Sequence, residues 1–150
     1  MERTLVLIKP DAIQRNLAGE IISRFEKRVL KIAAMKMLWM DNDLASRHYS
    51  VHKNKAFFKD LVAFITSNPI IAIVFEGEKA VEVVRQTMGK TNAAEAAPGT
   101  IRGDLAIDLQ QNLVHGSDSL ENAINEIGIF FTEKEIFKYQ RPVDTWISES

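Results

Sequence analysis

The sequence predicts an α+β sandwich of the ferredoxin-like type, in which helices pack on a sheet. Two observations carry this prediction. Strand-like and helix-like segments follow one another in the order β-α-β-αα-β-α-loop-β, which contains two strand–helix–strand units. The chain has 150 residues, of which 46% are hydrophobic and 26% charged, and this size and composition suit one domain spanning residues 1–150.

The first half of this order begins with a strand. Residues Thr4–Ile8 form a short apolar, β-prone run that a lysine and a proline end, which is typical of a buried strand. Asp11 is placed to cap a short turn after it. Apolar side chains at helical spacing predict a helix over Gly19–Val29, and the apolar segment Leu30–Met40 predicts a second strand.

The middle of the chain predicts two helices, a strand and a further helix. Asp41–Asp43 is a helix-start signal that opens a helix through about Val51, and a second helical piece covers Phe58–Thr66. The continuous β-branched run Ile70–Phe75 is the clearest strand of the chain. Glu78–Met88 is then helical, with its apolar residues on one side.

The last third contains a long segment without a stable period. Gly89–Asn112 carries three glycines, a proline and a run of alanines, and a loop of this length in a compact domain is usually functional. Ser119 can cap a short helix through about Glu126. We then predict a last buried strand over Ile127–Phe131 and an extended tail over about 132–150.

Charge and composition exclude several classes of protein. The net charge is −1, with 19 Lys and Arg against 20 Asp and Glu, so nothing draws the chain as a whole to nucleic acid or membrane. The absence of cysteine excludes disulfides, cysteine-based zinc sites, iron–sulfur clusters and thiol nucleophiles. The apolar N-terminal run is too short for a signal peptide, and no stretch approaches the ~20 apolar residues of a membrane span. We expect a cytoplasmic protein that requires neither membrane nor nucleic acid.

Among the three histidines, His115 is the candidate nucleophile. The small and polar residues Gly116–Ser119 follow it, and they leave the imidazole open to a bulky substrate. A helix that starts there would offer backbone N–H groups to an anion, and a neutral imidazole can form a covalent intermediate. Taken alone, a stretch of this kind more often contains an exposed loop histidine than a nucleophile. It is no hydrolase triad, because neighbours in sequence rarely face one another and no G-x-S-x-G motif is present.

The other two histidines, His48 and His52, are four residues apart and share a helix face. Such a pair is half of a metal site, but no third ligand at a suitable spacing is evident. We therefore predict no protein-bound metal, and prefer a surface or phosphate-facing position for both.

Phosphate binding would have to rely on side chains, because the sequence contains neither a P-loop nor a G-x-G-x-x-G motif. Single charged residues are usually solvated, although arginine grips phosphate in bidentate fashion. Of the adjacent rings Phe57 and Phe58, at least one is expected in the core, and the other can stack on a base. The candidate hydrogen-bond donors to phosphate are Lys9, Arg85, Lys90, Thr91 and Arg102.

Four segments together resemble the nucleoside diphosphate kinase family. They read ERTLVLIKPDAIQR, FFKDLVAFI, PGTIRGD and NLVHGSDS, and the resemblance runs in order from Glu2 to about Phe131. It implies a kinase that moves the γ-phosphate of a nucleoside triphosphate to a nucleoside diphosphate, by a ping-pong mechanism through a phosphohistidine and with broad base tolerance. It also implies a ferredoxin-like fold with a four-stranded antiparallel sheet.

The resemblance assigns roles by position. His115 is then the nucleophile, and Glu126 orients its imidazole. Tyr49 lies near the nucleophile, and His52 falls where a histidine can reach a phosphate. The remaining assignments concern the nucleotide itself: Lys9 and Asn112 for the ribose hydroxyls and the phosphate end, Arg85, Thr91 and Arg102 as the phosphate clamp, and Phe57 and Leu109 on the two faces of the base.

The resemblance further implies Mg²⁺ bound chiefly to the nucleotide phosphates, and a homo-oligomer. The C-terminal stretch Thr145–Glu149 is similar to that of family members that form hexamers rather than tetramers, so a hexamer is expected. The chain departs from the family at Val29, where glycine is common, and at Ala56 and Ala93, where proline is common. The alternative function is a non-catalytic regulator that binds nucleotides or nucleic acid on the same fold, although the aromatic strand signature of RNA readers is missing.

Overall fold

The computed structural model describes residues 1–149. Its centre is one four-stranded sheet in the order β2-β3-β1-β4, and each neighbouring pair is antiparallel. The predicted α+β, ferredoxin-like fold is therefore confirmed. The strands are β1 (Glu2–Ile8), β2 (Lys31–Leu38), β3 (Ile70–Gly77) and β4 (Val114–Gly116).

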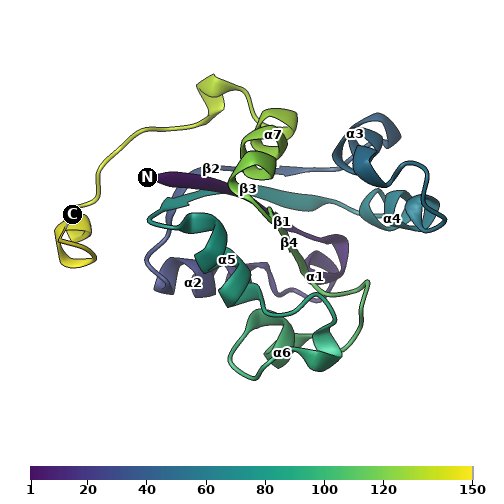
Figure 1. Ribbon diagram of the computed structural model, residues 1–150, viewed down its shortest axis with the longest axis horizontal. Helices are drawn as coiled ribbons and strands as arrows, with labels where there is room; N and C mark the ends of the chain where they lie inside the picture. Colours follow the sequence, from purple (N-terminus) through teal and green to yellow (C-terminus); the bar gives the residue numbers. More distant parts are fainter. Residues whose placement is uncertain (150) are drawn as a thin grey trace.

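The helices connect these strands across both faces of the sheet (Figure 1). None of the described helices is long and apolar enough to cross a membrane. The α-helices are α1 (Pro10–Gln14), α2 (Ala18–Lys27), α3 (Asn42–His48), α4 (Phe58–Ile65), α5 (Ala80–Met88), α6 (Ile101–Leu105) and α7 (Leu120–Phe130). Short 3-10 helices are η1 (Ser50–His52), η2 (Ala93–Glu95), η3 (Glu133–Glu135) and η4 (Pro142–Trp146).

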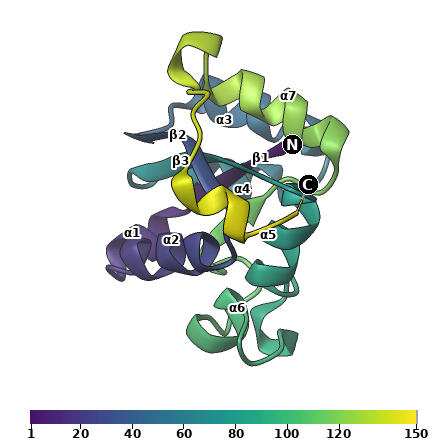
Figure 2. The same ribbon diagram turned by 90° about the vertical axis from the view of Figure 1, so that its left-hand side faces the viewer.

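The core has two layers because successive side chains of a strand point to opposite faces. In β1, Val6 and Ile8 join the cluster that packs on α2 and α5, whereas Leu5 and Leu7 join the cluster on the α7 side. Figure 2 shows α3 and α7 above the sheet and α2 and α5 below it. With both faces covered, the inner strands are apolar without alternation, and this explains the continuous apolar runs of the sequence.

The predicted last strand over Ile127–Phe131 is wrong, because these residues close helix α7 and Phe131 is its C-cap. Ala123, Ile127 and Phe130 are buried at helical spacing on one face. A short apolar run does not distinguish a buried strand from the last turns of a helix. The fourth strand is instead β4, which carries His115, and Ser119 caps α7 as predicted through its bond from Asn122 N.

Other predictions need smaller corrections. The loop Gly89–Asn112 contains η2 and α6, and the helix expected to reach Val51 ends at His48 before η1. Asp11 does not cap a turn: it lies within α1, and its Oδ2 accepts a bond from Leu113 N at 3.0 Å. The tail at about 132–150, expected to be extended, includes η3 and η4 in its described part.

Helix α2 ends in a Schellman motif with an unusual residue. The N–H of Leu30 bonds Phe25 O and the N–H of Val29 bonds Glu26 O, the two bonds that define this motif. Val29 consequently has a positive φ of 64°, in a position where glycine is the usual residue. The departure from the family at this position thus coincides with a left-handed backbone.

Candidate active site

A cleft of about 660 Å³ opens at one end of the sheet, between the α3–α4 region and the loop before β4. Its walls come from Lys9 just after β1, from α3, η1, α4, α5, the loop 89–112, β4 and α7, segments far apart in the sequence. All the site residues named from the sequence line this cleft: Lys9, Tyr49, His52, Phe57, Arg85, Thr91, Arg102, Leu109, Asn112, His115 and Glu126.

Strand β4 places His115 opposite Leu7 of β1, which fixes the height of the imidazole at the floor of the cleft. A tight γ-turn leads into β4, in which Val114 N bonds Asn112 O and Leu113 has a φ of 75°. Two hydrogen bonds fix the backbone of Leu113 to the segment where β1 ends and α1 begins. Its N–H donates to the Asp11 carboxylate, and its carbonyl accepts from Lys9 N at 2.9 Å. The rigid turn sets the direction of the nucleophile candidate.

The His115 ring is oriented by Glu126 from α7. His115 Nε2 lies 3.0 Å from both carboxylate oxygens of Glu126, and Ser117 Oγ donates to the same carboxylate at 2.7 Å. Burial alone would raise the pKa of Glu126, but the hydrogen bond with His115, the charge of His115 and the bond from Ser117 hold that pKa below its usual value. An ionised carboxylate on Nε2 leaves Nδ1 as the nitrogen that faces a substrate.

Lys9 and Asn112 form a buried polar pair in the same cleft as His115. Lys9 Nζ donates to Asn112 Oδ1 at 2.6 Å and to the carbonyl of Gln110 at 2.8 Å. Asn112 in turn donates to Thr91 O at 2.9 Å, which ties the loop 89–112 to β4. Burial lowers the pKa of Lys9 to about 8, and the charge of Asp11 opposes this effect. At neutral pH the Lys9 amine is therefore largely protonated, but a small rise in pH removes its proton.

Arg102 ties three backbone segments of the cleft together. It is 4% exposed, and its guanidinium donates to the carbonyls of Val114 at 2.7 Å, Gly89 at 3.0 Å and Asn112 at 3.2 Å. Burial, with a smaller contribution from the charge of Arg85, lowers its pKa to about 10, so the group stays charged at neutral pH. With three of five N–H donors bound to carbonyls, two remain for a ligand.

The outer part of the cleft is apolar and exposed. Phe57 is 46% exposed and Leu109 60% exposed, whereas Phe58 is more buried, so the ring free for stacking is Phe57. The ring of His52 lies 5.4 Å from that of Phe57 and 6.5 Å from that of Tyr49. Burial raises the pKa of Tyr49 to about 12, so its hydroxyl keeps its proton as a donor.

His48 is the largest difference from the expected site. Rather than lying on the surface beside His52, it is 8% exposed and its ring meets that of His115 edge-on, with centroids 4.8 Å apart at 89°. Burial, together with the charges of His115 and His52, lowers the pKa of His48 to about 3, so the ring is neutral at physiological pH.

Comparison with known proteins identifies the family. A family model described as "Nucleoside diphosphate kinase" matches residues 2–136. The nucleoside diphosphate kinase of Thermomicrobium roseum is 53% identical over 147 residues, covering 98% of this chain and 99% of the relative, and that of Archaeoglobus fulgidus is 52% identical over 149 residues, covering 99% of both. The chain belongs to the nucleoside diphosphate kinase family.

Solved structures of the family share the fold along the whole chain. The Halobacterium salinarum nucleoside diphosphate kinase, solved in complex with CDP, superposes with a TM-score of 0.95 at 46% identity and covers 98% of each chain. A family protein from Babesia bovis gives 0.96 at 42% identity, covering 99% of this chain and all of the other. The predicted family and enzyme class are thus confirmed: the activity is that of a nucleoside diphosphate kinase, a nucleotide-binding phosphotransferase.

Three residues of this kinase site were not predicted to act in it. Asp11 and Ser117 stand inside the KPD and HGSDS segments, so the motifs contained them, but only the structure gives their partners, Leu113 N and Glu126. His48 had a visible signal as well, the i, i+4 pairing with His52, which pointed to the wrong companion. Its neighbours in space are 67 and 78 positions further along the chain, at His115 and Glu126.

Proposed function

We propose that this kinase transfers phosphate through a phosphohistidine at His115, with Nδ1 as the attacking atom. The carrying observation is the fixed ring: Glu126 occupies Nε2, so Nδ1 is left toward a cleft lined by Lys9, Arg85 and Arg102. Phosphoryl transfer requires positioning and neutralisation of charge more than any other protein chemistry, and this arrangement supplies both.

The proposed reaction has two symmetrical halves. The lone pair of Nδ1 attacks the γ-phosphorus, the bond from that phosphorus to the β–γ bridging oxygen breaks, and the diphosphate leaves with those electrons. The ring becomes positively charged, and the Glu126 carboxylate, hydrogen-bonded to Nε2–H, stabilises it. A second nucleoside diphosphate then attacks the phosphohistidine through a terminal β-oxygen and restores the neutral ring. The order predicts ping-pong kinetics.

Cations of the cleft bind the phosphates in this proposal. Arg85, exposed on the last turn of α5, and the two free donors of Arg102 face the oxygens, with Thr91 as a further donor. Lys9 and Asn112, already paired with each other, meet the ribose hydroxyls and the phosphate end.

Mg²⁺ fits the cleft as a companion of the nucleotide. Of the carboxylates that line the described cleft, Glu126 is engaged with His115 and Ser117, while Asp60 and Asp118 are exposed and separate. This donor set does not form a protein cage for a divalent ion, so the phosphates hold the ion and an exposed aspartate such as Asp118 assists. The bound ion neutralises charge on the transferring group.

The base is proposed to lie between Phe57 and Leu109, the two exposed apolar side chains of the cleft. Stacking on a ring does not discriminate strongly between bases, because every base has a π-face. Broad tolerance for both donor and acceptor follows from this arrangement.

The decisive test is labelling with γ-labelled ATP and Mg²⁺. Wild-type protein should take one label per chain at His115, the label should be lost in acid but survive alkali, and added GDP or CDP should remove it. The Ser117→Ala variant is the matched control, because it keeps the imidazole and should still be labelled. Label that resists acid, or persists in His115→Ala, refutes the assignment, and an unlabelled wild type favours the alternative of a non-catalytic regulator.

We further propose a homo-oligomer, a hexamer by the similarity of the C-terminal stretch. Strand β2 is a sheet edge, and three alternate residues on it and after it, Met35, Met37 and Trp39, are large, apolar and exposed. Unpaired edges and apolar patches of this kind are usually covered by a partner. Light scattering coupled to size exclusion measures the mass directly. A cytoplasmic location likewise stays a prediction, to be checked by fractionation.

A further inference from the structure

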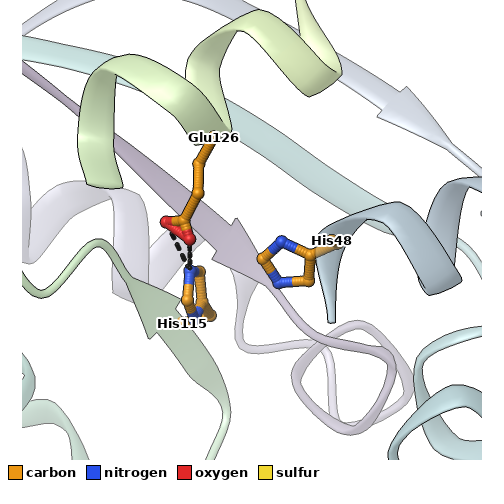
Figure 3. A group of neighbouring side chains, drawn as sticks. All are labelled: His48, His115 and Glu126. Atoms are coloured by element: carbon orange, nitrogen blue, oxygen red, sulfur yellow. Dashed lines mark hydrogen bonds and ion pairs between the residues drawn. The ribbon is translucent and has the colours of Figure 1, made fainter. Parts of the chain in front are cut away.

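The floor of the cleft brings two imidazoles and a carboxylate together, on the Nε2 side of the His115 ring. One ligand atom from each of His48, His115 and Glu126 lies within 4.8 Å of the others. Figure 3 shows an edge of the His48 ring turned toward the pair formed by His115 and Glu126. Two histidines and one glutamate are also the donor set of open zinc sites, in which a fourth position takes water.

His48 lacks the partners that a buried imidazole needs. Both of its ring nitrogens are buried, and neither has a hydrogen-bond partner among the described residues. The ring packs against three others: its centroid lies 4.6 Å from that of Tyr49, 4.8 Å from that of His115 and 5.4 Å from that of Phe130. Buried polar atoms of native proteins are nearly always paired, so these nitrogens require a partner from outside the chain.

We propose that His48, His115 and Glu126 bind one Zn²⁺ ion, and that the bound ion inhibits phosphoryl transfer. Zinc bonds of 2.0–2.2 Å place neighbouring ligand atoms about 3.3 Å apart. His115 Nε2 and Glu126 already meet this spacing at 3.0 Å, and a turn of the His48 side chain closes the remaining gap from at most 4.8 Å. As the ion takes the lone pair of Nε2, the single proton of the neutral His115 ring passes by way of solvent to Nδ1, and no net proton is released.

Inhibition follows from the chemistry of one ring. Glu126 then bonds the ion instead of accepting a hydrogen bond from Nε2–H, so the carboxylate no longer supports charge on the imidazole. With zinc on Nε2, the proton of the neutral ring lies on Nδ1, so Nδ1 no longer has a free lone pair with which to attack phosphorus. This consequence rests on the proposed role of His115 in transfer, whereas the binding itself does not.

The first experiment measures binding without nucleotide. Calorimetric titration of Zn²⁺ into the wild-type chain should give one bound ion per chain. The His48→Phe variant keeps a ring for edge-on packing but has no nitrogen, and it should bind at least about tenfold more weakly. The His52→Phe variant, which removes a cleft imidazole outside the trio, should bind as the wild type does.

Two binding results would overturn the proposal: no saturable binding by the wild type, or equal affinity in His48→Phe. Circular dichroism establishes that each variant is folded, and His48→Gln, which is smaller and a poor zinc ligand, replaces His48→Phe if the latter unfolds.

A second experiment tests inhibition by labelling with γ-labelled ATP and Mg²⁺ after incubation with Zn²⁺. Label on the wild type should fall in proportion to zinc occupancy and return after chelation, while His48→Phe keeps the labelling of its own zinc-free sample. An equal fall in both proteins means that zinc acts on the nucleotide, and inhibition at this site is then refuted. A wild type that binds zinc but takes no label even without it refutes the phosphohistidine and leaves the metal site standing.

Discussion

Replacing Val29 by glycine should stabilise this protein, although the substitution removes a side chain and adds no contact. Val29 is the residue after the C-cap of α2 and has a φ of 64°. A left-handed backbone costs an L-residue ~1–2 kcal/mol, and a β-branched side chain there is a genuine outlier. The Schellman bonds from Val29 and Leu30 maintain this conformation, so the cost is present in every folded molecule.

The gain is smaller than the strain that is relieved. Glycine loses ~0.5–1 kcal/mol more conformational freedom on folding than other residues do. Val29 is 46% exposed, so removal of its side chain loses about half of the ~1.5–3 kcal/mol that full burial of a valine contributes. A β-branched residue stands at or above the upper end of the strain range, so the balance is a net gain of at most about 0.5–1 kcal/mol in the free energy of unfolding. For a chain of this size the melting temperature rises by ~1–4 °C.

Thermal melts at matched concentration measure this gain for Val29→Gly beside two comparison variants. Val29→Asn should also stabilise, because asparagine tolerates the left-handed region without the flexibility of glycine. Val143→Gly is the matched control, since Val143 is 48% exposed but lies in the 3-10 helix η4, and it should lower the melting temperature. If Val29→Gly melts at or below the wild-type temperature, backbone strain is not what this position costs, and the argument fails.

Three further predictions concern the loop, the lysine and the base. Ala93 is the first residue of η2, where no backbone N–H is needed, and Asn92 before it is extended at φ −79° and ψ 106°. Ala93→Pro should therefore add ~0.4–1 kcal/mol to the free energy of unfolding with turnover unchanged. A lower melting temperature would show that the buried site cannot hold the proline ring. Because the pKa of Lys9 is lowered to about 8, the free enzyme loses this positive charge as pH rises through 8, and kcat/KM should fall above that pH. The Lys9→Gln variant should be slower and should show no such fall at high pH. If the fall persists in the variant, it belongs to another group. Phe57→Ala should weaken ADP binding by ~1–3 kcal/mol, roughly 5- to 150-fold by calorimetry, while Phe137→Ala, exposed outside the cleft, leaves it unchanged; equal affinity in both would mean that the base does not stack on Phe57.

The fold was predictable where strands are long and buried on both faces, as over Thr4–Ile8 and Ile70–Phe75. It was not predictable at β4, because three residues are too few to show a period, and a neighbouring helix end offered a longer apolar run in Ile127–Phe131. The strand order β2-β3-β1-β4 depends on pairings between distant segments, which local patterns do not encode.

The cleft was predictable in its membership but not in its contacts. The motif resemblance supplied its residues, since chemistry restricts the side chain at each position. Arg102, however, bonds the carbonyls of Gly89, Asn112 and Val114, and a carbonyl acceptor leaves no trace in the residue type that carries it. The place of His48 was hidden for a related reason. Burial depends on which face of the helix meets the sheet, and the i, i+4 spacing to His52 pointed to a different neighbour.

Two of the left-handed residues, Val29 and Leu113, show how a cost in backbone strain differs with its surroundings. At Leu113, φ is 75°, and the turn is held by the carboxylate of Asp11, by the N–H of Lys9 and by the γ-turn bond into Val114. These contacts overdetermine the conformation and transmit it directly to His115, two residues later, so the strain secures the direction of the proposed nucleophile. At Val29 the same kind of strain ends a surface helix, where glycine would form the same two bonds. Relief at Val29 should therefore be gained without loss of activity, whereas freedom at Leu113 would loosen His115, the proposed nucleophile.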